Sequence, residues 1–438
     1  ADVRKRWGSP TMAQTHSTRC CRAHLINIGD ELLDGVRLNG HLVWLGQQLA
    51  RRGIRLEQAS VVRDELPALV SEIRQAWGRC DLVVTTGGMG PNLDDLVREA
   101  VAEALGLPLD PDAEAERALR ARFAKIGRQV SDADLRQCRL PRGAVSLPNV
   151  RGTSPGLFLS KDGRSMVLLP GPGIEMMPLF EEEVLPRLRS CGSASEGDAY
   201  VQVRTYGIGA APLEALVRPL LQPGMRLTFG THSGVVDARI SPGTSGACAE
   251  RMMQVARAVR EAVGDDFVCT GHSTLAELAV ERLGGIGRTL AVAESCTGGL
   301  LASNLTDVPG ASRVLAGSIV AYTNDAKVSI LGVPQALIDQ HGPVSAEVAA
   351  AMATAAAERF GADHGIAVTG YAGPDGGTTA DPVGTVYLGY ASASGVWSRR
   401  LVLAGDRGQV KARAVNAALD WLRRKLSRYA IEDAIHGA

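Results

Sequence analysis

The stretch Thr289-Leu-Ala-Val-Ala-Glu-Ser-Cys-Thr-Gly-Gly299 decides the fold of the C-terminal part of the chain. Its apolar run is typical of a buried strand, and it passes through Ser295 into two glycines and the helical pattern LLASNL. Strand, turn and helix in this order predict an α/β unit. At such a junction backbone N–H groups converge on an anion or a developing oxyanion, so Ser295 is a candidate nucleophile.

The same alternation of apolar runs, glycine-containing turns and amphipathic helices begins at His24 and resumes at Thr274. It predicts two α/β units, each built around a mostly parallel sheet. Between them, two strand-like runs interleave with two helical segments and predict a small α+β unit. The expected organisation is a disordered tail at 1–23, with Met12 as a candidate natural start, an α/β unit at 24–185, an α+β unit at 186–270 and an α/β unit at 271–438.

The composition excludes several classes of protein. The chain has 438 residues with 47 basic and 47 acidic side chains, so its formal net charge is +0. A nucleic-acid-binding domain is expected to be strongly basic, whereas this balance is compatible with a small charged substrate. The eight cysteines form no CxxC pair and no zinc-type cluster. Without a signal-like segment or an apolar run of about 18 residues, the sequence predicts a cytoplasmic protein with reduced thiols and with neither membrane nor nucleic-acid partners.

Lys327 is the candidate base for Ser295. It lies in Ala321-Tyr-Thr-Asn-Asp-Ala-Lys327, which follows another apolar strand and is therefore expected at the edge of the sheet where α/β proteins bind ligands. A partly desolvated lysine can take a serine proton near neutral pH, and Tyr322 could hold or relay that proton. The pair predicts hydrolysis of an amide or an ester.

Each of these residues also has an ordinary alternative explanation. Ser295 or Thr297 could simply cap the following helix, and Lys327 could be a surface lysine. Cys296 is a rival nucleophile, because thiolates are intrinsically better nucleophiles than serine. It ranks below Ser295, since no histidine lies in the motif to activate it and its side chain is expected to point away from that of Ser295.

A third segment, Val368-Thr-Gly-Tyr-Ala-Gly-Pro-Asp-Gly-Gly-Thr378, also follows a strand and is rich in glycine. Glycines at this density let backbone amides approach a phosphate or an oxyanion closely, although a flexible surface loop has the same composition. Further along, Arg407, Lys411 and Arg413 offer cations for a phosphate or a carboxylate. A solvated basic helix face explains Lys411 and Arg413 equally well.

Together these segments resemble the C-terminal domain of the CinA family, a nicotinamide-nucleotide amidase domain, over residues 274–425. The resemblance implies a Ser–Lys pair that converts nicotinamide mononucleotide into nicotinate mononucleotide and ammonia, with no metal or other cofactor. The motifs that carry it are AESCTGG, GSIVAYTNDAK, LGV, HGPVSAE, VTGYAGPDGGT, PVGTVY and GDR.

This resemblance assigns roles to particular residues. Ser295 is implied to be the nucleophile, Lys327 its base and Tyr322 a support for both. Tyr371, Asp381 and Lys411 stand where the family pattern has isoleucine, lysine and arginine. A lysine keeps the charge of arginine but lacks the planar fork that grips a phosphate. The residues implied to bind the substrate are Thr297, Gly298, Gly299, Thr369, Gly370, Gly373, Gly376, Gly377, Arg407 and Lys411.

A second constellation combines Ile28-Gly-Asp-Glu-Leu32 with Val84-Thr-Thr-Gly-Gly-Met-Gly-Pro-Asn-Leu-Asp-Asp95, and each segment follows an apolar strand. Carboxylates suit Mg²⁺ or a similar ion that bridges phosphates, and glycines bring the backbone against those phosphates. Helix capping by Asp94 is the structural alternative. The candidate metal ligands are Asp30, Glu31, Asp94 and Asp95, and the candidate phosphate contacts are Gly87, Gly88 and Gly90.

With NGHLVWLGQQLARRG, GTSPGL and LLPGPGIEMMPLFEE, residues 24–185 resemble the N-terminal domain of CinA proteins, which is related to molybdopterin-binding folds. The whole chain is thus similar to full-length CinA proteins. The resemblance implies cleavage of ADP-ribose at its pyrophosphate with Mg²⁺, Mn²⁺ or Co²⁺. Asn39-Gly40-His41, Asn92 and Gly173-Ile174 replace Asn-Thr-Asn, threonine and Pro-Ser of the family pattern, so polar contacts are expected to be lost there.

Two other functions compete with this interpretation. A nucleotide-binding regulatory or interaction protein without catalysis would not require Ser295 and Lys327 as a pair. A pterin-binding role in cofactor synthesis rests only on fold analogy for the N-terminal unit. The family resemblance also favours a homodimer whose ligands are small nucleotides.

Overall fold

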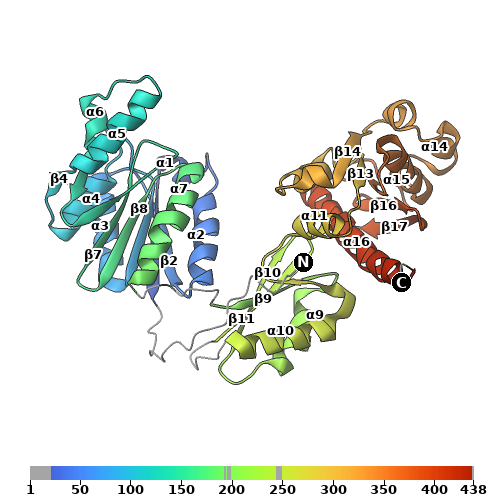
Figure 1. The fold of residues 1–438 in the computed structure, drawn as a ribbon, viewed down its shortest axis with the longest axis horizontal. Coiled ribbons are helices and arrows are strands. Elements are labelled where there is room, and N and C mark those ends of the chain that lie inside the picture. The colour runs from blue at the N-terminus through green and yellow to red at the C-terminus, as the bar shows by residue number, and fades with distance from the viewer. Residues whose placement is uncertain (1–20, 192–193, 195–198, 243–248, 437–438) are drawn as a thin grey trace. The chain divides into compact units, whose positions relative to one another are not determined.

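The computed structural model describes residues 21–191, 194, 199–242 and 249–436 (Figure 1). The chain forms two compact units, Ala1–Ala199 and Tyr200–Ala438. Within the second unit we call residues 200–270 the middle subdomain and residues 271–436 the C-terminal subdomain. In the described part of the chain, no helix has the length and apolar character needed to cross a membrane.

The first unit is built on a six-stranded sheet in the order β2-β1-β3-β8-β7-β6. The first four strands in this order run parallel, whereas β7 and β6 add antiparallel pairs at one edge. A separate two-stranded ribbon pairs β4 with β5. The strands are β1 (Arg22–Ile28), β2 (Arg55–Val62), β3 (Leu82–Thr86), β4 (Leu109–Pro111), β5 (Arg139–Pro141), β6 (Ala144–Leu147), β7 (Gly156–Lys161) and β8 (Arg164–Leu169).

Helices cover both faces of this sheet (Figure 1). Leu49 of α2 and Met176 of α7 pack in the core on one face, whereas Ile73 of α3 and Val101 of α4 pack in the core on the other. The unit is therefore a three-layer α/β structure. Its helices are α1 (Asp30–Leu33), α2 (Gly40–Arg51), α3 (Leu66–Arg79), α4 (Val97–Leu105), α5 (Ala113–Lys125), α6 (Asp132–Leu135), α7 (Gly173–Leu179) and α8 (Leu185–Ser190), with a 3₁₀ turn at Arg136–Cys138 and a π-helical turn at Phe180–Val184.

The start of the first unit corrects one predicted boundary. Residues 1–20 of the expected tail lie outside the described part, but Arg22 and Ala23 belong to β1. The backbone N–H of Arg22 donates to Asp81 at 2.9 Å, and Ala23 is fully buried. Packing and hydrogen bonding thus begin two residues before His24, because the strand extends past its most apolar segment.

The middle subdomain is an antiparallel sheet in the order β10-β11-β9-β12, with two helices packed on it. Val203 of β9, Leu213 of α9 and Val255 of α10 share its core. This arrangement confirms the expected α+β character. Its elements are β9 (Val201–Tyr206), α9 (Ala210–Val217), a 3₁₀ turn at Arg218–Leu220, β10 (Arg226–His232), β11 (Val235–Ser241), α10 (Ala249–Val263), the 3₁₀ turn η5 (Gly264–Asp266) and β12 (Phe267–Thr270).

The C-terminal subdomain has a mixed five-stranded sheet in the order β14-β13-β15-β16-β17. Strands β14, β13 and β15 are parallel, and β16 and β17 follow as antiparallel neighbours. The carboxyl ends of the three parallel strands therefore meet at one edge of the sheet. The strands are β13 (Leu290–Glu294), β14 (Leu315–Val320), β15 (His364–Gly370), β16 (Thr385–Ser392) and β17 (Gly395–Val402).

Helices again cover both faces of this sheet. Leu283 of α11, Leu301 of α12 and Ala418 of α16 pack on one side, and Met352 of α15 packs on the other. The α/β class predicted for this part of the chain is confirmed. The helical elements are α11 (Leu275–Gly285), α12 (Leu300–Thr306), a 3₁₀ turn at Ala311–Arg313, α13 (Asn324–Ala326), the π-helical turn η7 (Lys327–Leu331), α14 (Gln335–His341), α15 (Ala346–Phe360) and α16 (Arg407–His436).

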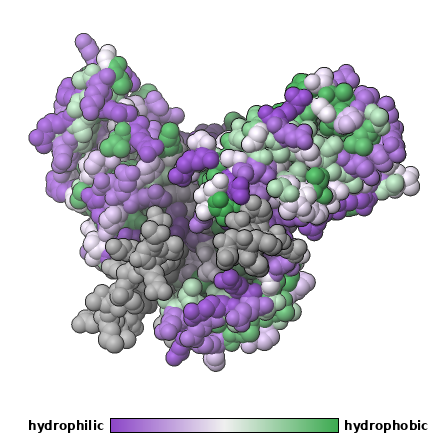
Figure 2. All heavy atoms as spheres, turned by 45° about the vertical axis from the view of Figure 1, so that its right-hand side comes forward, coloured by the Kyte–Doolittle hydropathy of each residue, from purple (hydrophilic) through white to green (hydrophobic). Residues whose placement is uncertain are grey.

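The surface of the protein is mostly hydrophilic on the face drawn in Figure 2, with smaller apolar areas between the hydrophilic ones. Some large apolar side chains are nevertheless exposed, among them Leu38 at 92% and Leu93 at 87%. Leu38 lines a cavity of the first unit, and Leu93 lies in sequence between two other lining residues, Asn92 and Asp94.

Candidate active site

Ser295 and Lys327 meet at the edge of the C-terminal sheet where the parallel strands end. The Nζ atom of Lys327 donates a hydrogen bond to Oγ of Ser295 at 3.1 Å. Both side chains are buried, with 2% of Lys327 and 6% of Ser295 exposed. Ser295 directly follows β13, and its N–H donates to the carbonyl of Val368 in β15, which fixes the start of the turn. The structure therefore joins a hydroxyl to an amine in a site shielded from water.

The side chain that caps the following helix belongs to Glu294, and this corrects the capping alternative for Ser295 and Thr297. The fully buried Glu294 carboxylate accepts hydrogen bonds from the N–H groups of Gly299 (3.0 Å), Leu301 (3.0 Å) and Ala302 (2.8 Å). Neither hydroxyl is needed as a cap, and the Ser295 hydroxyl is instead hydrogen-bonded to Lys327. Three N–H groups at the start of α12 are also occupied, so these do not serve an external anion as the sequence led us to expect.

Lys327 sits at a change of helix type. It follows the single helical turn α13. Thr323 caps this turn, and its hydroxyl accepts from the N–H of Ala326 at 3.1 Å. At Lys327 the chain widens into the π-helical turn η7, a form that occurs mostly as short bulges and often at functional sites. Burial lowers the pKa of Lys327 below its ordinary value of 10.5, because the charged ammonium is desolvated. Lys327 is thus suited to act as a base.

Tyr322 was predicted to support Ser295 and Lys327, but its hydrogen-bond partner in the structure is a different residue. Its side chain is 55% exposed, and its hydroxyl accepts a hydrogen bond from Nη2 of Arg407 at 2.6 Å. Arg407 also donates from Nη1 to the carbonyl of Gly373 at 2.7 Å. Arg407 therefore links Tyr322 to the glycine-rich loop at the start of α16, and it is the described partner of Tyr322.

Lys411 approaches the turn that carries Ser295. A Cβ atom added to Gly298 would lie 3.8 Å from the Lys411 ammonium nitrogen, and Gly298 has a φ of 61°, a conformation that favours glycine. The start of α16 is fixed by Asp406, whose carboxylate accepts from the N–H of Gln409 at 2.8 Å while the Gln409 side chain accepts in return. One helix terminus thus brings Lys411 to the nucleophile turn and Arg407 to Tyr322 and the glycine-rich loop.

Local contacts explain several residues of the glycine-rich loop that were predicted to contact the substrate. A Cβ on Gly370 would lie 2.7 Å from the carbonyl of Thr385, and one on Gly377 would lie 2.4 Å from the N–H nitrogen of Val383. The buried Thr369 hydroxyl donates to the carbonyl of Pro343 at 2.9 Å. Gly373 and Gly376 adopt φ values of 86° and 97°. Backbone packing therefore accounts for Gly370 and Gly377, a side-chain hydrogen bond accounts for Thr369, and positive φ accounts for the other two glycines.

Cys296 is a poor nucleophile in this environment. Only 7% of its surface is exposed, and it belongs to the apolar core that includes Leu301 and Val368. Burial raises the pKa of its thiol to about 11. Since the thiolate is the reactive form, the structure supports the ranking of Ser295 above Cys296.

The first unit contains a cavity of about 510 Å³ at the carboxyl ends of its parallel strands. Gly87 and Gly88 line it with φ values of 96° and 64°, and a Cβ on Gly87 would lie 2.4 Å from the carbonyl of Ile28. Below them, buried Arg98 donates to the carbonyls of Met89 and Gly90 and holds the glycine turn in place. Arg98 does not belong to any recognisable sequence motif, so its role in holding the glycine turn could not be predicted from the sequence.

The acidic residues predicted as metal ligands are spread around this cavity. Asp30 pairs with Arg63 at 3.3 Å, and Asp95 accepts from the N–H of Asn92 at 2.9 Å. Glu31, Asp94 and Asp95 line the cavity, whereas Asp30 is not among its lining residues. In the part of the chain that the structure describes, no three histidine, cysteine or acidic side chains are grouped to hold a metal ion. The four predicted residues therefore do not form a ready-made metal cage.

Asp64 is an acidic lining residue that the sequence interpretation missed. Its carboxylate accepts from the N–H of Asp30 at 3.2 Å. Burial raises the pKa of Asp64, and the nearby negative charges of Asp30, Asp94 and Glu31 add to that rise. Asp64 follows β2 rather than the strands that carry the glycine motifs, so only the parallel order of the sheet brings it to the site.

Two residues of the Asn39-Gly40-His41 segment make polar contacts within the protein. Asn39, which the family pattern shares, caps α2, since its side chain accepts from the N–H of Leu42 at 3.2 Å. His41 lines the cavity, and its Nδ1 atom lies 3.2 Å from the Thr86 hydroxyl. The changed residue His41 thus keeps a polar contact with the end of β3.

Comparisons with known proteins match both units. The family model of the CinA C-terminal domain matches residues 272–426, and that of the probable molybdopterin binding domain matches residues 24–190. A CinA-like protein of Desulfovibrio desulfuricans is 38% identical over 419 residues, which cover 94% of this chain and 97% of that protein. A putative competence-damage inducible protein of Symbiobacterium thermophilum is 40% identical over 426 residues, with 93% and 99% covered. A solved structure of a CinA superfamily protein from Escherichia coli is 36% identical and covers 37% of this chain and 97% of that chain, with a TM-score of 0.34.

Proposed function

The chain belongs to the CinA family, and we propose that its C-terminal subdomain hydrolyses the carboxamide of nicotinamide mononucleotide to nicotinate mononucleotide and ammonia. The observation that carries this proposal is the buried hydrogen bond between Lys327 and Ser295. A pure binding site has no need for a desolvated amine beside a hydroxyl, whereas a serine nucleophile needs an adjacent general base, which a neutral amine can supply.

The chemistry follows from the two side chains. Lys327 in its neutral form takes the Ser295 proton as Oγ attacks the carboxamide carbon. The resulting ammonium returns that proton to the departing nitrogen, so ammonia leaves and an ester links substrate and serine. Water then attacks the ester with Lys327 as base again, which releases the carboxylate and restores the serine. The lowered pKa of Lys327 supports this cycle, because it increases the neutral fraction.

Cations beside the nucleophile turn support a nucleotide substrate rather than a simple amide. Lys411 lies near Gly298, and Arg407 bridges Tyr322 and the carbonyl of Gly373. Both carry positive charge, and a phosphate beside them would be bound by charge-assisted hydrogen bonds. We assign the phosphate of the substrate to these two residues.

Ammonia release from nicotinamide mononucleotide tests the proposal. The wild-type protein is expected to release ammonia and nicotinate mononucleotide, and Ser295→Ala is expected to release neither while it still binds the substrate. Asp307→Asn, an exposed change at the far end of α12, is the control and should keep full activity. Binding without turnover in the wild-type protein would instead favour a nucleotide-binding regulatory role. Full activity of Ser295→Ala would overturn the Ser–Lys assignment.

A second activity is favoured by the cavity of the first unit. We propose that this cavity binds a nucleoside diphosphate sugar such as ADP-ribose, because backbone of positive φ at Gly87 and Gly88 lies beside acidic side chains. The carboxylates of Asp64 and Asp94 would hold a divalent cation together with the substrate phosphates, since Mg²⁺ is often bound by one or two carboxylates plus phosphate oxygens. Such an ion would neutralise the pyrophosphate charge during cleavage.

This second proposal is tested with ADP-ribose and each of Mg²⁺, Mn²⁺ and Co²⁺. AMP is the expected product, and Asp94→Asn should reduce its formation. Binding of ADP-ribose without AMP under every metal would leave a binding function for this unit. Co-purification of a pterin would favour a different ligand class.

A further inference from the structure

Helix α16 connects the candidate active site with the middle subdomain. Its first residues include Arg407, which bonds Tyr322 and Gly373, and Lys411, which lies beside the nucleophile turn. Further along it carries Asp420, Arg423 and Arg424. Asp420 lies thirteen positions after Arg407 in the helix, which corresponds to about 20 Å along its axis. One continuous element therefore reaches from the proposed phosphate contacts to the other subdomain.

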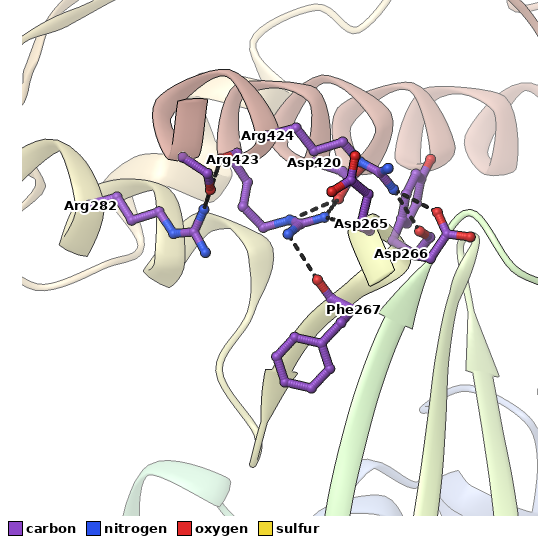
Figure 3. Close-up of polar contacts among 9 residues, drawn as sticks. Asp265, Asp266, Phe267, Arg282, Asp420, Arg423 and Arg424 are labelled. Atoms are coloured by element: carbon purple, nitrogen blue, oxygen red, sulfur yellow. Dashed lines mark hydrogen bonds and ion pairs between the residues drawn. The ribbon is translucent and has the colours of Figure 1, made fainter. Parts of the chain in front are cut away.

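The three distal residues form an ionic cluster in which Asp420 and Arg423 are buried and Arg424 is partly buried (Figure 3). Oδ1 of Asp420 accepts from Nε and Nη2 of Arg423 at 2.9 and 2.6 Å, and its Oδ2 accepts from Nε of Arg424 at 2.7 Å. The side chains of Asp420 and Arg423 are only 2% and 6% exposed. Asp420 thus fixes both guanidinium groups in defined directions, as expected for buried charges that are fully paired.

The remaining donors of both arginines bind the middle subdomain. Arg423 donates to the carbonyls of Phe267 at 2.9 Å and Asp265 at 2.8 Å. Arg424 donates to the carbonyl of Tyr206 at 3.0 Å and to the carboxylate of Asp266 at 2.9 Å. These acceptors belong to η5, β12 and the end of β9, so α16 is hydrogen-bonded to one corner of the antiparallel sheet (Figure 3).

Helix α16 is also hydrogen-bonded near Arg423 by a residue of the C-terminal subdomain itself. Nη1 of Arg282, in α11, donates to the carbonyl of Arg423 at 2.8 Å and also bonds the Ser427 hydroxyl. Nearer the active site, the Asn416 side chain donates to the carbonyl of Ser233 at 3.0 Å. The position of α16 along its axis is therefore set by contacts with α11 and with two places in the middle subdomain.

The part of α16 between Lys411 and Asp420 is suited to move as one rigid body. No proline or glycine occurs between Gln409 and Ser427, and Val410, Ala414 and Leu422 are among the residues that bury it in the core. Lys411 and Asp420 are about two and a half turns apart and so lie on opposite faces. A shift of the helix at Asp420 would move Lys411 relative to Gly298, since a buried helix moves largely as a rigid body.

We propose that the Asp420–Arg423–Arg424 cluster positions Arg407 and Lys411, so that the middle subdomain sets the affinity for the anionic end of the substrate. This inference rests on the proposed function of the C-terminal subdomain. Asp266, Arg424 and their partners act as positioning residues, because they touch neither Ser295 nor Lys327. Their loss is expected to weaken phosphate recognition and to leave the Ser–Lys chemistry intact.

The test measures binding by calorimetry in the Ser295→Ala background, with nicotinamide mononucleotide and with its phosphate-free riboside. Asp266→Asn and Arg424→Met should weaken mononucleotide binding by about tenfold, because small displacements far from the reacting atoms can have large effects. Riboside binding should not change. Asp266→Glu, which keeps the carboxylate, should restore most of the mononucleotide affinity. With Ser295 present, the KM for the mononucleotide should rise while kcat is kept.

Lys425→Met is the matched control, because it removes one positive charge from the neighbouring position of α16, where the ammonium lies 3.2 Å from the centre of the Trp397 ring. It should bind both ligands as the parent does. Equal weakening of mononucleotide and riboside in Asp266→Asn would show general structural damage and overturn the inference, as would unchanged mononucleotide binding. If the Ser295→Ala parent itself fails to bind the mononucleotide, the proposed function fails first, and the inference falls with it.

Discussion

The Nζ atom of Lys327 lies 3.1 Å from Oγ of Ser295, although 32 residues separate them in the chain. Parallel pairing of β13 with β14 places the carboxyl ends of both strands at the same edge, and each residue belongs to the segment that leaves its strand. Burial of both groups excludes the water that would otherwise solvate the ammonium. The pair therefore depends on sheet order as much as on the two side chains.

Ser295 and Cys296 are adjacent, so variants at both positions separate their roles. Ser295→Ala is expected to lower kcat for ammonia release by at least about a thousandfold, as removal of a catalytic nucleophile typically does. Cys296→Ala should keep kcat within about threefold, because a thiol with a pKa near 11 is almost wholly protonated at neutral pH. Steady-state ammonia assays on the two variants decide the question, and the opposite pattern would make Cys296 the nucleophile.

The pH dependence of kcat/KM should report the titration of Lys327. The base must be neutral, so activity is expected to rise with pH through the lowered pKa of this lysine and then to level off. Profiles measured between about pH 5 and 10 provide the test. Lys327→Arg should remove the activity, because arginine stays protonated over this range. A wild-type profile that is flat throughout would argue against a lysine base.

The pH dependence of folding stability should also report the titration of Lys327. The pKa of Lys327 is lower in the folded protein than its ordinary value of 10.5, so between these two values the unfolded chain binds the additional proton. Lys327 therefore makes stability rise with pH in that window, and below it the buried charge is unfavourable. Urea unfolding at several pH values checks this. Lys327→Met should reduce the rise, and an unchanged pH dependence in this variant would contradict the prediction.

Glu294 should stabilise the turn that presents Ser295. Glu294→Gln leaves an NH₂ group facing backbone N–H donors, and we expect the free energy of unfolding to fall by about 1–3 kcal/mol. Asp307→Asn removes an exposed charge at the other end of α12 and should change stability by less than about 0.5 kcal/mol. Urea unfolding of both variants at one pH compares them, and equal stability of Glu294→Gln and the wild type would rule out this role.

In the first unit, Asp64→Asn tests the acidic residue that only the structure identifies. If Asp64 and its neighbours bind a divalent cation with ADP-ribose, AMP formation should fall by at least about tenfold. Ammonia release by the same preparation is the internal control and should not change. The product is measured by chromatography with saturating metal, and full AMP formation would exclude Asp64 from the site.

Much of the fold follows from the alternation of strands and helices, because that pattern is imposed by the packing of helices on parallel sheets. The same reasoning places Ser295, Tyr322 and the glycine loop at one sheet edge. It does not identify Glu294 as the helix cap, since glutamate at the end of an apolar strand has no capping signature and serine or threonine is the usual choice. Asp64 and Arg98 were missed because neither forms part of a local motif.

The raised pKa and burial of Cys296 have a practical consequence for chemical probes. A reagent that alkylates or oxidises exposed thiols should spare this centre even though a sulfur atom stands next to the nucleophile. Covalent inhibitors of the proposed amidase would therefore need an electrophile selected for an activated hydroxyl, with an anionic group to engage the cations of α16. Selectivity over cysteine hydrolases would then be inherent in the choice of electrophile.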